Sequence, residues 1–120
     1  MLQRQVYVAG RVKTMNNAIM ENVDAIHNAI ARNLKISFQY FQWNVKKEPE
    51  LRKNGARYVI SPWGLSWDDE NYYMVGYDAD ADMIKHYLVD KMLHIRIENT
   101  KREGRYKFKE IDMAAYGIVI

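Results

Sequence analysis

Three short segments in the middle of the chain constrain its fold more than any other feature. They cover residues 58–65, 72–78 and 84–92, and each combines tyrosine with valine, isoleucine or leucine. Such residues favour strands, and the gaps between the segments have the length of hairpin loops. Inside the first segment, Pro62-Trp63-Gly64 predicts a bend or a bulge. The sequence therefore predicts an antiparallel sheet at the centre of the domain.

The chain before these segments supplies a helix and one more strand. Between residues 16 and 33, apolar residues recur at steps of four, three and four: Ile19, Val23, Ile26 and Ile30. This spacing predicts an amphipathic helix with those four residues facing inward. Residues 35–43 alternate apolar and polar side chains, which predicts a strand. Residues 44–56 are charged and contain Pro49 and an Asn-Gly pair, so we expect a long loop or an arm there.

A last strand is predicted over residues 93–98, which gives one helix followed by five short, bent strands. This order indicates a mainly β domain of the α+β class. We expect its five strands to form a small antiparallel barrel of the SH3 or Sm-like type, because closing the sheet removes exposed strand edges. We place this domain at residues 16–99. Residues 1–15 are interpreted as a linker or edge arm, and residues 100–120 as the start of a C-terminal extension, in which residues 111–116 predict a helical turn.

Composition limits the classes of function. The chain has 120 residues, the size of one domain, and it contains no cysteine, so disulfide frameworks and thiolate chemistry are excluded. It has no run of 18 apolar residues, and its first residues lack the apolar core of a secretion signal. We therefore expect a cytoplasmic protein that does not enter the membrane.

Charge is unevenly distributed along the chain. The net charge is +3, basic residues cluster at 46–57 and 85–107, and residues 67–82 carry six acids with no lysine or arginine. A clustered basic surface attracts polyanions. Surface strands also carry lysine and arginine for solubility and to protect their edges, and on charge alone we favour this second interpretation.

The residue patterns do not indicate an enzyme. Ser61, His86 and Asp90 are the set closest to a catalytic triad, but His86 and Asp90 would lie about 13 Å apart along one strand at ~3.3 Å per residue. The histidines have no metal-ligand spacing, and no phosphate-binding loop or dinucleotide fingerprint is present. We expect no catalysis, no metal and no cofactor.

In their order and spacing, the three central segments resemble a WYL domain, the sensor module of many bacterial helix-turn-helix transcription regulators. The family is named for a Trp-Tyr-Leu triplet, and Tyr72-Tyr73-Met74 stands at that place. The resemblance covers residues 25–98. It implies the same small barrel and a sensing role, in which promoter DNA is bound only through a helix-turn-helix domain that is absent from this chain.

The resemblance also implies a polar and basic pocket gathered from neighbouring strands. The candidate residues for binding a ligand or nucleic acid are Tyr40, Ser61, Tyr73, His86, Leu88, Lys91 and Arg96. Family members usually carry arginine where Leu88 stands, and a guanidinium clamps phosphate bidentately whereas leucine cannot. An anion-binding role is therefore either weakened here or moved to Lys91, His86 or Arg96.

Aromatic side chains are abundant on the same strands and have two interpretations. In small barrels they stack bases, with basic side chains holding phosphates. They are also favoured in any sheet, and we expect at least half of them to be core residues.

Two functions follow from these patterns. The first is an effector-sensing domain of a bacterial transcription regulator, which binds a nucleotide-like ligand or single-stranded nucleic acid. The second is an interaction or dimerisation module without a ligand, formed by the helix, the N-terminal arm and the apolar tail at residues 117–120. Symmetric dimers are the commonest assemblies, and we expect a homodimer. A concave cluster of Tyr40, Tyr73 and Lys91 would favour sensing, whereas an apolar environment around Leu88 would favour interaction alone.

Overall fold

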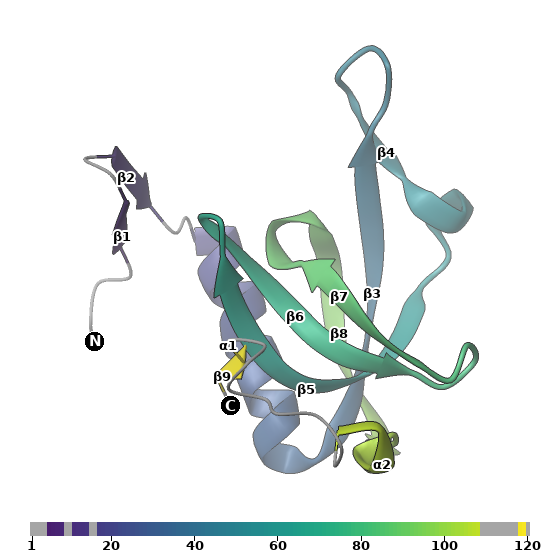
Figure 1. Ribbon diagram of the computed structural model, residues 1–120. Coiled ribbons are helices and arrows are strands. Elements are labelled where there is room, and N and C mark those ends of the chain that lie inside the picture. Colours follow the sequence, from purple (N-terminus) through teal and green to yellow (C-terminus); the bar gives the residue numbers. More distant parts are fainter. Residues whose placement is uncertain (1–4, 9–10, 15–16, 109–117, 120) are drawn as a thin grey trace.

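One long helix and a strongly curved antiparallel sheet form the centre of the molecule (Figure 1). The computed structural model describes residues 5–8, 11–14, 17–108 and 118–119, with side chains described over residues 18–108. The helix is α1 (Asn17–Arg32). The strands of the sheet are β3 (Leu34–Trp43), β4 (Pro49–Leu51), β5 (Tyr58–Asp68), β6 (Asn71–Asp78), β7 (Met83–Leu88) and β8 (Met92–Lys101). Two 3-10 turns, η1 (Arg52–Gly55) and η2 (Val89–Lys91), interrupt the sequence of strands.

Helix α1 buries the face that its spacing predicts. Val23 and Ile26 are 2% and 0% exposed, and Ile19 and Ile30 pack against the same core, which confirms the predicted inward face. The helix ends at Arg32, and Asn33 follows with a φ of 60°, a left-handed conformation that asparagine tolerates better than most residues.

The sheet runs in the order β4-β3-β5-β6-β7, with β8 paired to the other side of β3, and the described ladders of this sheet are antiparallel. It curls into a half-barrel with α1 packed against it, so the predicted fold class is confirmed (Figure 1). Its end strands β7 and β8 are joined through η2, and the described ladders do not include one between them. The register of β5 shifts between Pro62 and Gly64, which is the predicted bulge.

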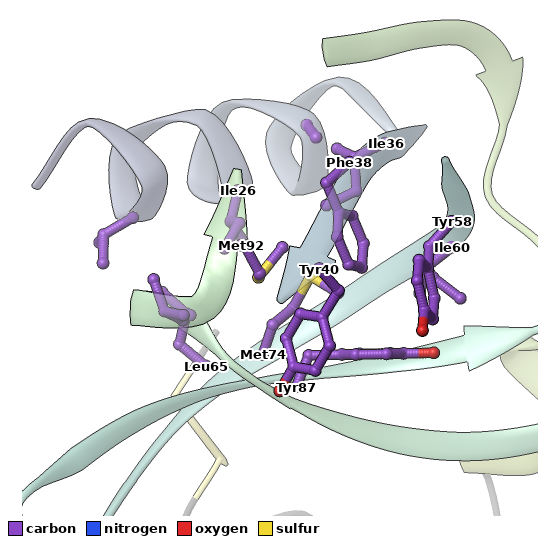
Figure 2. Packing of buried hydrophobic residues seen from close by; sticks show 13 residues of the cluster. Ile26, Ile36, Phe38, Tyr40, Tyr58, Ile60, Leu65, Met74, Tyr87 and Met92 are labelled. Carbon is purple, nitrogen blue, oxygen red and sulfur yellow. The ribbon is translucent and has the colours of Figure 1, made fainter. Parts of the chain in front are cut away.

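The core lies between α1 and the concave face of the sheet. Figure 2 shows apolar side chains from the helix and from several strands meeting there, with Ile26 and Met92 near the helix and Tyr40, Tyr58 and Tyr87 farther from it. Asn22 fixes the helix to η2 and to the start of β8, because its side-chain amide donates to the carbonyls of Val89 and Met92 at 3.1 and 2.9 Å.

Residues 44–56 form an arm, one of the two forms that the sequence allows. β4 pairs with the end of β3, with Phe41 opposite Leu51 and Trp43 opposite Pro49, and the hairpin projects from the half-barrel (Figure 1). The Asn44 carboxamide oxygen accepts from the backbone N–H groups of Lys46 and Glu48 and so closes the turn.

The described segments at the two ends form three short strands, of which the first two make a separate two-stranded sheet. Strands β1 (Gln5–Val8) and β2 (Arg11–Thr14) pair with each other, and β9 (Ile118–Val119) pairs with β5. The helical turn predicted over residues 111–116 lies outside the described residues. No helix in the described part of the chain is long and apolar enough to cross a membrane.

The segment after β8 packs on the convex side of the sheet. Helix α2 (Arg105–Phe108) places Phe108 against Trp63, with ring centroids 5.4 Å apart. Gly104 precedes it with a φ of 90°, and a Cβ there would lie 2.1 Å from the Tyr77 ring, so this position requires glycine. A second small cluster, Trp63, Val75, Tyr77 and Phe108, is thereby buried outside the main core.

Candidate functional site

A cleft of about 370 Å³ lies between β3, η1, β5 and β7. Its volume falls within the range of small-molecule sites, near the lower end. Its wall combines aromatic rings with positive charges and is lined by Tyr40, Arg52, Lys53, Tyr58, Ile84, Lys85, His86 and Tyr87.

Two tyrosine hydroxyls in the cleft wall have unused hydrogen-bonding capacity. Tyr58 and Tyr87 are 6% and 4% exposed, and neither buried hydroxyl has a hydrogen-bond partner among the described residues. The rings are fixed by Phe38, which stacks on Tyr58 at 5.5 Å and meets Tyr87 edge to face at 5.3 Å. Burying a hydroxyl without a partner destabilises a fold, and such groups are uncommon in native proteins. These two hydroxyls are therefore the candidate hydrogen-bond donors of the cleft wall.

Tyr40 differs from the other two tyrosines. Its hydroxyl accepts a hydrogen bond of 2.9 Å from the backbone N–H of Leu88, so its polar group already has a structural partner. Burial raises the pKa of Tyr40, and burial together with the charge of Asp78 raises the pKa of Tyr87. Both phenols are neutral near pH 7 and keep the proton that a donor needs.

The positive charges come from two elements that are distant in sequence. Arg52 and Lys53 belong to η1, and Lys85 belongs to β7. Lys85 donates a 2.8 Å hydrogen bond to Asp78. Burial alone would raise the pKa of Asp78, but the hydrogen bond and charge of Lys85 bring that pKa below its ordinary value. The wall thus carries three cations, of which Lys85 is paired with Asp78, and this excess of positive charge suits the cleft to an anion.

The η1 turn brings its cations to the cleft through an unusual backbone. Lys53 and Asn54 both have a φ of 55°, in the left-handed region that most residues avoid. The turn is held by the side-chain amide of Gln39, which donates to the carbonyl of Gly55 at 2.8 Å. As a result, the Lys53 ammonium lies 3.9 Å from the centroid of the Tyr58 ring.

The structure brings only part of the sequence-derived set to this cleft. Tyr40 and His86 line it, and His86 is exposed on the edge strand β7. Tyr73 and Leu88 are half-buried and lie opposite each other on β6 and β7. The neighbouring pair, Met74 and Tyr87, belongs to the core. Since successive residues of a strand face opposite sides, Tyr73 and Leu88 point to the convex side.

The remaining candidates lie at separate places. Ser61 is 1% exposed, and its hydroxyl accepts a 2.9 Å hydrogen bond from the backbone N–H of Glu103. Lys91 is half-buried in η2, and Arg96 is exposed on β8 opposite Ser37. Ligand binding by these residues stays a prediction. Among the described residues, the cleft wall includes Tyr40 but neither Tyr73 nor Lys91.

Sequence reasoning did not select several residues that line the cleft: Arg52, Lys53, Tyr58, Lys85 and Tyr87. One signal was available in the sequence. Arg52 and Lys53 lie in the basic cluster that directly precedes the strand beginning at Tyr58. A hairpin arm that folds back on its own strand brings such charges beside the strand's first residues.

Comparison with known families agrees with this architecture. A family model described as the WYL domain matches residues 21–97. No match was found among curated proteins. The matched span includes every residue of the cleft wall.

Proposed function

Because the chain belongs to the WYL domain family, we propose that it is the sensing domain of a bacterial transcription regulator, and that its effector binds in the cleft. The effector is nucleotide-like or a single-stranded nucleic acid. One observation carries this proposal: the buried hydroxyls of Tyr58 and Tyr87, which have no hydrogen-bond partner among the described residues, belong to the wall of the same cleft as Arg52, Lys53 and Lys85.

The chemistry of the cleft suits a phosphate-bearing ligand. Phosphate oxygens accept hydrogen bonds, and the two phenols are donors without a partner in the described part of the chain. The ammonium and guanidinium groups add charge-assisted contacts, which are stronger than neutral ones. A cleft of about 370 Å³ accommodates roughly one nucleotide, so a single strand would place one unit inside and the rest along the surface.

The proposed role is binding in the cytoplasm rather than catalysis. The cleft is formed by η1 and by the edge strand β7, and β7 leads through η2 to the contact that Asn22 makes from α1. An effector that binds one arrangement of these elements better than another shifts their populations. A DNA-reading domain connected to α1 would respond to that shift, and this is the allosteric coupling that regulation requires.

Calorimetric titration tests the proposal with adenosine monophosphate and a trimer of deoxyadenosine as probes. We expect micromolar or weaker binding that decreases as salt is raised, because phosphate contacts depend on ionic strength. Tyr58→Phe and Tyr87→Phe should each weaken it, because each removes one donor. The matched control is Tyr73→Phe, the same change on the convex side. If only the control variant loses binding, the effector site is on the convex side and the cleft proposal fails.

A second function, homodimerisation without a ligand, is favoured by the arm. Its tip presents Val45 at 99% exposure, with Trp43 and Leu51 at 56% and 39%. Contiguous exposed apolar surface marks interaction sites, and this alternative requires these side chains to form one such surface. Under this alternative, Val45→Asp lowers the mass measured by analytical ultracentrifugation, while Val59→Asp, at another exposed valine, does not. A monomeric wild-type chain would exclude it.

A further inference from the structure

Lys53 covers the solvent side of the Tyr58 ring. Phe38, which is fully buried, stacks on this ring with an angle of 11° between the planes. Lys53 is exposed, and its ammonium lies 3.9 Å from the ring centroid. The core therefore occupies one side of the ring, and on the side toward the cleft the ammonium takes the place where a flat ligand ring would stack.

The Lys53 ammonium stands at the end of an exposed side chain, whereas the backbone that carries it is held by hydrogen bonds. Two hydrogen bonds hold η1: the Gln39 side chain donates to the Gly55 carbonyl, and the N–H of Ala56 donates to the Lys53 carbonyl. Both fix the main chain of the turn, and neither uses the ammonium. Residues held in left-handed conformations are enriched at ligand clamps. The ammonium is thus able to leave the ring while η1 keeps its shape.

We propose that Lys53 determines the specificity of the cleft, which accepts a flat ring only when the ring carries an anionic group. This inference rests on the cleft being the effector site. Moving the ammonium off Tyr58 gives up a cation–π contact. An anionic ligand offsets that loss, because the released ammonium pairs with it, and the hydroxyls of Tyr58 and Tyr87 donate to the same oxygens. An uncharged ring cannot form an ion pair with the ammonium, so the lost cation–π contact is not offset.

The specificity is tested by comparing a nucleotide with its nucleoside. Adenosine monophosphate, adenosine and inorganic phosphate are titrated against the wild-type chain, Lys53→Ala and Lys53→Met. The alanine removes both the charge and the cover over the ring, whereas methionine removes the charge and leaves the ring covered. Lys46→Ala, at an exposed lysine in the turn of the arm, is the matched control.

The wild-type chain should bind the nucleotide at least roughly tenfold more tightly than adenosine, the scale of one charge-assisted contact. Lys53→Ala should weaken nucleotide binding by roughly tenfold and strengthen adenosine binding by roughly fivefold, because the ring becomes free for stacking. Lys53→Met should lose nucleotide affinity without gaining adenosine affinity. Inorganic phosphate alone should bind weakly. Titration with the deoxyadenosine trimer then shows whether the cleft prefers a free nucleotide or a nucleic-acid strand.

Two failures are distinguishable. In the first, Tyr87→Phe weakens nucleotide binding, but the ratio of nucleotide affinity to adenosine affinity is the same in Lys53→Ala as in the wild-type chain. The inference about Lys53 is then wrong, and the cleft remains the effector site. If no variant binds nucleotide or trimer, both proposals are wrong. Thermal melting of each variant establishes that it is folded.

Discussion

The hydroxyl of Tyr40 accepts a 2.9 Å hydrogen bond from the backbone N–H of Leu88, although the two residues are 48 positions apart. Tyr40 lies on β3, where its Cα partner is Met92 of β8, so this bond joins β3 to the end of β7 across the interior of the half-barrel. The bond holds together two strands that have no ladder of their own among the described pairings. Tyr40 therefore has a structural role beside its place in the cleft wall.

Replacing Tyr40 by phenylalanine should destabilise the domain. The change removes the acceptor and leaves the N–H of Leu88 without its partner in a partly buried environment. The expected loss is about 1–3 kcal/mol in the free energy of unfolding, measured by urea denaturation. Nucleotide affinity should change little, because the Tyr40 hydroxyl is already engaged. Unaltered stability would contradict the structural role assigned to this bond.

Replacing Tyr87 by phenylalanine should have the opposite pattern. Its hydroxyl is buried and unpartnered among the described residues, so its removal relieves a desolvated polar group. We expect the free energy of unfolding without ligand to stay the same or to rise by up to about 1 kcal/mol. Nucleotide affinity should fall at the same time. A variant that loses stability would mean that this hydroxyl has a structural partner.

Much of the fold was predictable because its signals are local. The helix follows from the spacing of Ile19, Val23, Ile26 and Ile30, and the bulge follows from Pro62-Trp63-Gly64. Each depends on residues within one turn or one strand. The alternation of core and surface positions likewise follows from the strand period of two.

The cleft was less predictable because it depends on contacts between distant segments. Lys53 and Lys85 are 32 residues apart, and only the strand order β3-β5-β6-β7 and the folding back of η1 bring both to one cleft. Whether a tyrosine hydroxyl has a partner is also invisible in the sequence: Tyr40 has one and Tyr87 has none among the described residues. The bond from Glu103 to Ser61 is similar, since it comes from a segment 42 positions away.

Acid should destabilise the domain through Asp78. Its pKa is lower in the folded state than in the unfolded state, so its contribution is fully present above the unfolded value of about 3.9 and is lost as pH falls toward the folded pKa. Urea denaturation between about pH 5 and pH 2 should show this loss. Lys85→Met should reduce it, because the hydrogen bond and charge that lower the pKa of Asp78 are then gone.

Asp82 also contributes to the loss of stability in this pH range. Comparing the wild-type chain with Lys85→Met removes that contribution, because it is the same in both. Hydrogen bonds from Tyr106 and Tyr77 lower the pKa of Asp82, and the Lys85 substitution leaves them intact. The difference between the two pH profiles therefore isolates Asp78. Identical profiles would contradict the assigned role of Lys85.

Leu88→Arg distinguishes the convex side of the sheet from the cleft as the effector site. Leu88 is half-buried beside Tyr73, so we expect the arginine to reach solvent and the domain to stay folded, with a loss of about 1 kcal/mol on urea denaturation. The new guanidinium lies outside the cleft wall, so nucleotide affinity should stay within about twofold of wild type, a change of about 0.4 kcal/mol. Leu88→Gln controls for the loss of the apolar side chain. A tenfold gain in nucleotide or trimer binding by the arginine variant alone would place the anion site on the convex side, beside Tyr73, as the family resemblance first suggested.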